Sequence, residues 1–179
     1  MKSFDDWVAE LGVKHRHKDA FWHLVLSGAD ALPAVRRGLV SDDDGIRIGC
    51  TKVLDHLVDE ECWPELIAMI EDENPEVRAW TLHSLACERC KEQGCSLPER
   101  EQVLPPAIQA LEGDADQHVR QMAIGVVAKW MYDNGTAAAA LLAAHEHDPH
   151  PAVRKKAGWF VPGGSLFEKH RPKPARVTR

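Results

Sequence analysis

Four copies of a short motif divide the chain at near-regular intervals. Each copy begins with an acidic or acidic-flanked stretch, passes through a turn, and ends in Val-Arg or Ile-Arg. The copies are SDDDGIR (41–47), DENPEVR (72–78), DADQHVR (114–120) and DPHPAVR (148–154). Self-similarity of this kind is typical of a chain built by stacking one supersecondary unit. The motif therefore constrains the fold more than any other feature of the sequence.

Each copy carries the signal for the start of a helix. Asn74 and Asp116 stand where a side-chain oxygen can accept a hydrogen bond from an amide of the first turn. Asp43 holds this place in the first copy and His150, the weakest of these caps, in the fourth. Pro75 follows its cap at the first helical position, where a missing amide costs nothing. The motif thus predicts four helices.

Apolar residues at helical spacing follow each start and precede each copy. Small residues that allow close helix approach stand four places after each Val or Ile, at Cys50, Thr81, Ala123 and Ala157. The preceding segments are ALPAVRRGLV (31–40), CWPELIAMI (62–70), EQVLPPAIQALEG (101–113) and AAAALLAAHEH (137–147). The predicted unit is a helix, a short turn and a second helix. Two further helices are predicted near Ser3–Leu11 and Lys18–Ser27.

The repeated unit resembles the HEAT-repeat family. The likeness rests on NPEVRAWTLHSL (74–85), DQHVRQMAIGVV (116–127) and HPAVRKKAGWF (150–160), and it covers about residues 29–161. The motif arginines lie 31, 42 and 34 residues apart, and the shorter intervals look like the compact repeats of bilin lyases. The resemblance implies an all-α fold, an α-solenoid of about four HEAT-like helix pairs after the two extra N-terminal helices.

The chain is expected to divide into a solenoid domain and a tail. Residues 1–161 form the HEAT-like domain in this prediction, and residues 162–179 form a flexible basic tail after a Gly-Gly break. Nucleic acid, an acidic partner or the acidic body of the same chain could attract this tail. A role in solubility alone explains its composition equally well.

The arginines of the motif are interpreted as a structural ladder. The row consists of Arg47, Arg78, Arg120 and Arg154. Each arginine could bind an acid or a carbonyl group in an adjacent turn, since ion pairs of this kind are usually structural. The alternative is a row that binds an anionic ligand. The nearby acids, which are Asp42, Asp72, Asp114 and Asp148, would neutralise much of such a row.

The longest interval between motif arginines coincides with a cluster of cysteines. At about 100° per residue, His83, Cys87 and Cys90 lie on one side of a helix, and Cys95 follows Gly94, which can turn the chain back. His83, Cys87, Cys90 and Cys95 could therefore hold a structural zinc ion. Reduced thiols without a ligand are the other main interpretation, and a disulfide between Cys90 and Cys95 or between Cys87 and Cys95 is a third.

A row of aromatic and polar residues runs beside the core positions of the second helices. We call it the second-helix ridge, and its members are Lys52, His56, Trp80, His83, Met122, Lys129, Lys156 and Trp159. Tryptophan and methionine beside lysine and histidine are typical of an interaction surface. The alternative is that Trp80 and Trp159 cover the edge of the core.

Charge and composition narrow the class of partner. The formal net charge is −6, but five Lys/Arg against one acid in residues 161–179 leave −10 on residues 1–160. An acidic body is a poor match for a phosphate backbone. The first residues contain early acids and no apolar run, and no segment approaches the roughly 20 apolar residues of a membrane span, so we expect a cytoplasmic protein without a membrane segment.

The function that these features favour is protein binding. The sequence contains no Gly-rich phosphate loop, nucleophile elbow or HExxH motif, so we expect a non-catalytic HEAT-repeat adaptor or scaffold with no cofactor beyond the zinc considered above. Its protein partner would bind along the second-helix ridge. The alternative, which follows from the family resemblance, is a lyase-like chaperone or an enzyme of the bilin lyase or DNA-repair type.

Overall fold

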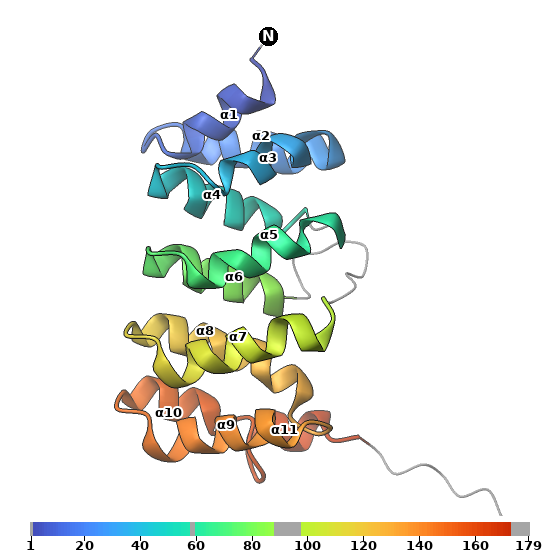
Figure 1. The fold of residues 1–179 in the computed structure, drawn as a ribbon, viewed down its shortest axis with the longest axis vertical. Helices are drawn as coiled ribbons and strands as arrows, with labels where there is room; N and C mark the ends of the chain where they lie inside the picture. Colours follow the sequence, from blue (N-terminus) through green and yellow to red (C-terminus); the bar gives the residue numbers. More distant parts are fainter. Residues whose placement is uncertain (1, 58–59, 88–97, 173–179) are drawn as a thin grey trace, which may run out of the picture.

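The computed structural model describes residues 2–57, 60–87 and 98–172, and all regular elements in these ranges are helices. Figure 1 shows them stacked as one elongated column, with the N-terminus at one end and the last helix at the other. The predicted all-α solenoid is confirmed.

The column begins with the two predicted N-terminal helices, α1 (Phe4–Leu11) and α2 (His17–Ser27). Ser3 and Asp6 form a reciprocal cap at the start of α1, in which the Ser3 hydroxyl accepts from the Asp6 amide and the Asp6 carboxylate accepts from the Ser3 amide. Both helices pack against the first repeat, because α1 contacts α3 (Leu32–Gly38) and α4 (Asp44–Leu54), and α2 contacts α4.

Four helix pairs follow, as the motif predicts. The first helices are α3 (Leu32–Gly38), α5 (Trp63–Ala68), α7 (Arg100–Gly113) and α9 (Gly135–His147). The second helices are α4 (Asp44–Leu54), α6 (Pro75–Ala86), α8 (Gln117–Val127) and α10 (Pro151–Ala157). Single 3-10 turns extend some of them: η1 (Gly28–Ala31), η2 (Glu60–Cys62), η3 (Met69–Glu71) and η4 (Ala128–Trp130).

The second helices form one continuous layer of the solenoid. Helix α4 contacts α6, α6 contacts α8, and α8 contacts α10, while α7 and α9 pack together in the layer of first helices (Figure 1). The four small residues of the repeat, Cys50, Thr81, Ala123 and Ala157, are all completely buried. They let neighbouring helices approach closely, as the sequence pattern predicts.

Each second helix begins at the predicted cap. The side chains of Asp43, Asn74, Asp116 and His150 accept hydrogen bonds from amides of the first turn. Pro75 stands at the start of α6, as expected. The positions of these caps fix the starts of the second helices and hence the direction in which the turn residues face.

The structure differs from the sequence-based expectation in the segment after Val161. Part of the proposed tail forms a helix, α11 (Ser165–His170). This helix folds back on the last repeat, because the Phe167 amide donates to the Trp159 carbonyl at 2.8 Å and the Tyr132 hydroxyl bonds the Phe167 carbonyl. Residues 173–179 of the proposed tail lie outside the described residues.

Candidate functional site

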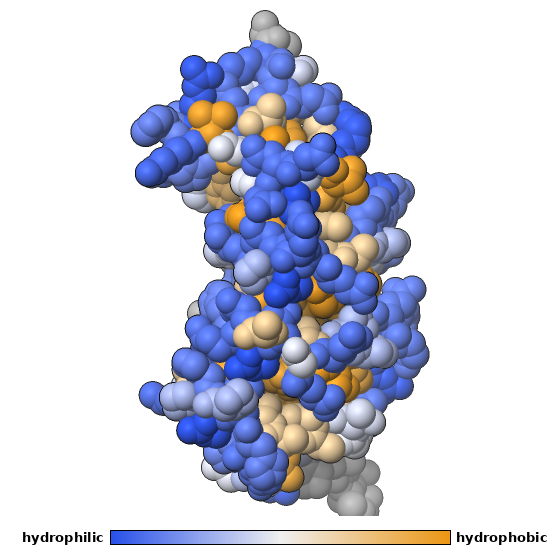
Figure 2. Space-filling model, turned by 60° about the vertical axis from the view of Figure 1, so that its left-hand side comes forward, coloured by the Kyte–Doolittle hydropathy of each residue, from blue (hydrophilic) through white to orange (hydrophobic). Residues whose placement is uncertain are grey.

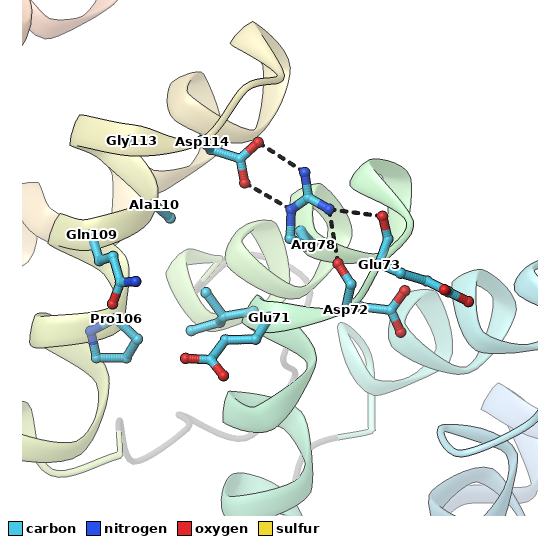
Figure 3. A pocket seen from close by; sticks show the side chains of 10 residues that line it. Glu71, Asp72, Glu73, Arg78, Pro106, Gln109, Ala110, Gly113 and Asp114 are labelled. Carbon is cyan, nitrogen blue, oxygen red and sulfur yellow. Dashed lines mark hydrogen bonds and ion pairs between the residues drawn. The ribbon is translucent and has the colours of Figure 1, made fainter.

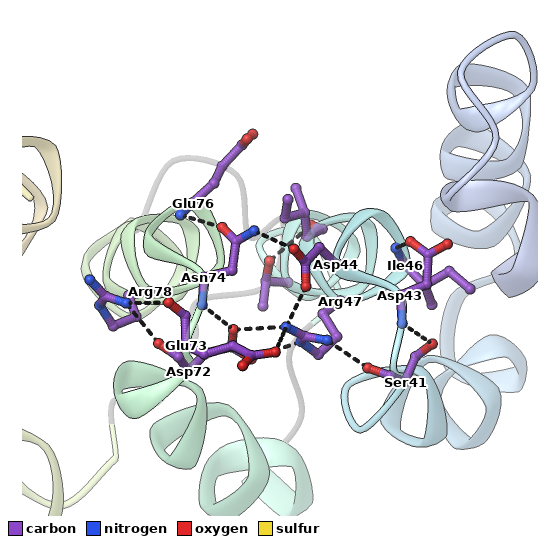
Figure 4. Close-up of polar contacts among 12 residues, drawn as sticks. Ser41, Asp43, Asp44, Ile46, Arg47, Asp72, Glu73, Asn74, Glu76 and Arg78 are labelled. Atoms are coloured by element: carbon purple, nitrogen blue, oxygen red, sulfur yellow. Dashed lines mark hydrogen bonds and ion pairs between the residues drawn. The ribbon is translucent and has the colours of Figure 1, made fainter.

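The motif arginines link each repeat to the next. Arg47 Nε and Nη2 donate to the Asp72 carboxylate at 2.8 and 3.1 Å, and Arg47 Nη1 donates to the Ser41 carbonyl at 2.7 Å (Figure 4). Arg78 binds Asp114 in the same forked geometry, at 2.7 and 2.9 Å. Arg78 also donates to the Asp72 carbonyl at 2.8 Å, so both guanidinium groups hold their own turn and the following one, as the predicted ladder requires.

The last two arginines complete the ladder. Arg120 donates to the Asp148 carboxylate at 2.8 and 3.1 Å. Arg154 Nη1 donates to the Asp148 and Pro149 carbonyls of its own turn. Three of the four arginines therefore have a carboxylate partner, which argues against a row that binds an anionic ligand.

The carboxylates of Asp114 and Asp148 are shielded from water and ionised. Burial would by itself raise the pKa of Asp148, but the hydrogen bonds from Arg120 and from the His150 amide outweigh burial and lower it below the usual value. The pKa of Asp114 is lowered in the same way, with burial opposed by Arg78 and the Asp116 amide. The pairs formed by Arg78 with Asp114 and by Arg120 with Asp148 are therefore structural, because each guanidinium is already neutralised by a carboxylate.

An open groove lies beside the ladder between the second and third repeats. Figure 3 shows this groove, which has a volume of about 440 Å³ and is lined by residues that include Glu71, Pro106 and Gln109. Arg78 lines this groove, but its guanidinium group is bound by the Asp114 carboxylate. The remaining charges of the lining are acidic, so the groove is not suited to an anion.

The central part of the second-helix ridge is assembled around Trp80. Lys52 Nζ lies 4.7 Å from the centre of the Trp80 ring and also pairs with Glu76 at 3.3 Å. The His83 ring meets Trp80 edge-on, with 5.2 Å between ring centres. Trp80 is only partly buried, so the stacking of α4 on α6 presents an aromatic ring between a lysine and a histidine.

His56 belongs to a separate aromatic group at the N-terminal end of the ridge. Its ring lies 5.5 Å from that of Phe21 and 6.2 Å from that of Trp22. Trp22 is 47% exposed. The sequence analysis did not include Phe21 and Trp22 in the ridge, because they lie on α2 and reach His56 only through the packing of α2 on α4.

The C-terminal members of the ridge lie in more varied surroundings. Met122 packs against the core, and Lys156 Nζ donates to the Gln121 carbonyl at 2.7 Å. Burial lowers the pKa of Lys156. Trp159 is 41% exposed and follows the end of α10, and Lys129 lies in η4. Some members of the ridge therefore lie within the second helices, and others, such as Lys129 and Trp159, lie in the turns that follow them.

The face of the column that carries the turns is mostly hydrophilic. Figure 2 shows the side of the column that carries the turns, where small apolar patches are separated by polar and charged groups. The large exposed apolar side chains of the described residues include Trp22, Leu26 and Trp159.

The predicted zinc ligands lie only partly within the described residues. His83 is in the last turn of α6 and Cys87 is its C-cap, whereas Cys90 and Cys95 fall outside the described ranges. A residue missed by the sequence analysis joins the first two. Asp55, the C-cap of α4, has a carboxylate oxygen within 4.8 Å of the ligand atoms of both His83 and Cys87.

The other described cysteines are core residues. Cys50 and Cys62 are completely buried. Burial raises the pKa of the Cys50 thiol to about 12. No disulfide joins Cys50, Cys62 and Cys87, which are the cysteines in the described ranges.

Comparison with known proteins identifies the fold. No family model matches the chain, and no curated protein matches it. A solved structure of the complex of CpcE and CpcF of phycocyanin lyase from Nostoc sp. PCC7120 superposes with a TM-score of 0.71 at 19% identity, covering 86% of this chain and 95% of that one. The chain has a HEAT-like α-solenoid fold.

A second solenoid supports the same conclusion. A designed armadillo repeat protein in complex with the peptide (KR)4 superposes with a TM-score of 0.56 at 16% identity, covering 86% of this chain and 78% of that one. Among the residues that the structure describes, no helix is long and apolar enough to cross a membrane. At these identities the comparisons establish the fold alone.

Proposed function

We propose that this HEAT-like solenoid is a non-catalytic protein-binding module whose partner binds along the second-helix ridge. The observation that carries the proposal is the arrangement at Trp80, where Lys52 and His83 hold a partly exposed indole ring between two repeats. Partly exposed, preorganised tryptophans commonly contribute most of the energy of a protein interface. The proposed compartment is the cytoplasm.

The chemistry of the ridge supports a protein as the partner. The ridge combines lysine and histidine side chains with two tryptophans and a methionine, and such a surface offers both apolar area and hydrogen-bond donors. The charge of −10 over residues 1–160 opposes binding of nucleic acid to the body of the molecule. The two solved structures described above are both complexes, one of CpcE with CpcF and one of a designed repeat protein with a peptide.

The decisive test compares two tryptophans in similar surroundings. Trp7 on α1 also has a lysine over its ring, with Lys2 Nζ at 4.3 Å, and a histidine against it, with the His23 ring centre at 4.2 Å. Trp7 lies outside the second-helix layer. The variants Trp80→Ala and Trp7→Ala therefore remove the same kind of cluster from the ridge and from another part of the molecule.

The expected result is a selective loss of binding. With a partner isolated on the wild-type protein, Trp80→Ala should lower the affinity by about 2 kcal/mol or more, while Trp7→Ala should leave it unchanged. Melting temperatures measured on both variants separate binding from packing. If Trp80→Ala lowers the melting temperature strongly and the folded protein binds its partner normally, Trp80 is a core-edge residue and the proposal fails.

A second candidate function is that of a lyase-like chaperone. The extensive superposition on the phycocyanin lyase complex favours it over the DNA-repair type, which requires a basic groove. Incubation of the purified protein with a free bilin, followed by absorption spectroscopy of the protein fraction, tests this candidate. A stable spectral shift would favour the lyase-like function, and an unchanged bilin spectrum would favour the protein-binding module.

A further inference from the structure

Three metal-ligating side chains from two repeats meet at one end of the second-helix layer. Asp55 is the C-cap of α4, His83 lies in the last turn of α6, and Cys87 is the C-cap of α6. Their ligand atoms all lie within 4.8 Å of one another. In the described part of the chain this is the one group of three such residues with that spacing.

The distances are close to those of a tetrahedral zinc site. His83 Nε2 and Asp55 Oδ2 are 3.7 Å apart. Ligands that bind Zn²⁺ at about 2.0–2.2 Å in tetrahedral geometry lie about 3.4 Å from one another. A small movement of the exposed His83 ring and of Cys87 would bring all three donor atoms onto one ion.

The burial of Asp55 provides an independent reason to expect a cation. Its side chain is only 5% exposed, and Oδ1 has no hydrogen-bond partner among the described residues. A buried carboxylate without enough partners is costly unless a positive charge neutralises it. Asp72, Asp114 and Asp148 bind arginines, whereas the ion-pair partner of Asp55 within the described ranges is the His83 ring.

We propose that Asp55, His83 and Cys87 bind one Zn²⁺ ion between the first and second repeats. Carboxylate, imidazole and thiolate are all zinc ligands, and the thiolate favours zinc over magnesium or calcium. Binding would release the thiol proton of Cys87 to solvent. Three protein ligands leave one tetrahedral position for a water molecule or for a donor group of a bound partner.

This site differs from the zinc site predicted from the sequence. It keeps His83 and Cys87, and in place of Cys90 and Cys95 it takes Asp55, which comes from the neighbouring repeat. A metal bound in this way would fasten α4 to α6 directly. It also stands independently of the proposed partner, because its test measures metal binding and no partner is present.

The test is a metal titration of the full chain. The protein is reduced, freed of metal with a chelator, and titrated with Zn²⁺ by calorimetry and with Co²⁺ by absorption spectroscopy. We expect one equivalent of Zn²⁺ to bind and a thiolate-to-cobalt charge-transfer band to appear with Co²⁺. Absence of saturable binding, or a cobalt spectrum without that band, would overturn the proposal.

Three variants identify the ligands. Asp55→Asn, His83→Gln and Cys87→Ser should each lower the Zn²⁺ affinity by more than about 100-fold, because loss of a mere second-shell partner already costs about 10- to 100-fold. His56→Gln is the matched control, since His56 directly follows Asp55 and lies outside the group. The control should bind Zn²⁺ as the wild type does.

Asp55→Asn also distinguishes the two zinc sites. If His83, Cys87, Cys90 and Cys95 hold the metal, Asp55→Asn keeps the wild-type affinity, and that result would reject the site proposed here. Circular dichroism checks that each variant is folded. Should Asp55→Asn fail to fold, Cys95→Ser decides, because it lowers the Zn²⁺ affinity if the sequence-predicted site holds the metal and leaves the affinity unchanged if Asp55, His83 and Cys87 do.

Discussion

Arg120 and Asp148 are almost entirely withdrawn from water, with side chains 9% and 4% exposed. Arg120→Met would leave the Asp148 carboxylate buried without its forked partner, and breaking such a pair costs about 3–5 kcal/mol. We therefore expect a loss of about 3 kcal/mol or more in the free energy of unfolding, measured by urea denaturation. Arg37→Met is the control, because Arg37 and Asp5 form an exposed pair (61% and 63%) and its loss should cost less than about 1 kcal/mol.

The same carboxylates make the protein sensitive to acid. The pKa values of Asp114 and Asp148 are lowered from the ordinary 3.8 in the folded protein. At a pH between the folded and unfolded pKa values, the unfolded chain binds more protons than the folded protein. The contribution of these two ionised carboxylates to the free energy of unfolding is therefore present above about pH 4 and is lost as the pH falls further. Melting temperatures of the wild type and of Asp148→Asn should therefore converge below pH 4. Curves that remain parallel down to pH 2 would contradict this prediction.

At the scale of helices, close packing requires glycine at one contact between α1 and α4. A Cβ atom added to Gly49 would lie 2.6 Å from the Leu11 Cβ. Gly49→Ala gains about 1 kcal/mol of helix propensity but costs about 1–3 kcal/mol in overpacking. Because the clash is with an atom next to the backbone, we expect a net loss of about 1–2 kcal/mol in the free energy of unfolding.

Gly113→Ala is the control for this substitution. Gly113 is also helical, but nothing lies within 4 Å of the position of its added Cβ. Chemical denaturation should show its stability unchanged or slightly raised. Equal destabilisation by both substitutions would mean that the contact between α1 and α4 is looser than described.

Features that depend on neighbours in sequence could be predicted, and those that depend on stacking could not. The cap at Asn74 and the pairing of Arg78 follow from one motif and its repetition, and both are observed. Asp55 lies 28 residues from His83, and only the contact between α4 and α6 brings them together. The signal that could have revealed Asp55 is an acid that directly follows two apolar core residues, Val53 and Leu54. The helix containing Phe167 was missed because Gly163 and Gly164 predict a chain break, whereas Phe167 packs onto Tyr132.

For the molecule as a whole, the stack predicts a gradient of stability. Helices α6 and α8 have a neighbour in the second-helix layer on both sides, whereas α10 has one only on the side of α8 within the described residues. Solenoids are stabilised by contacts between adjacent repeats, and local opening follows the number of those contacts. Hydrogen exchange followed by mass spectrometry should show slowest exchange in α6 and α8 and faster exchange in α10 and α11. Uniform protection along the column would indicate that it unfolds as a single unit.

The ladder also defines which segment of the chain could be duplicated as a complete repeat. The carboxylates of Asp114 and Asp148 each accept hydrogen bonds from an amide of their own turn and from the arginine of the preceding repeat. The segment from residue 115 to residue 148 therefore contains one arginine, Arg120, and the aspartate with which it pairs, Asp148. A tandem duplication of that segment would give each copy its own pair and would present the second Arg120 to the second Asp148. Duplication of this segment in the gene would thus lengthen the solenoid by whole repeats, and each buried carboxylate would still have an arginine partner.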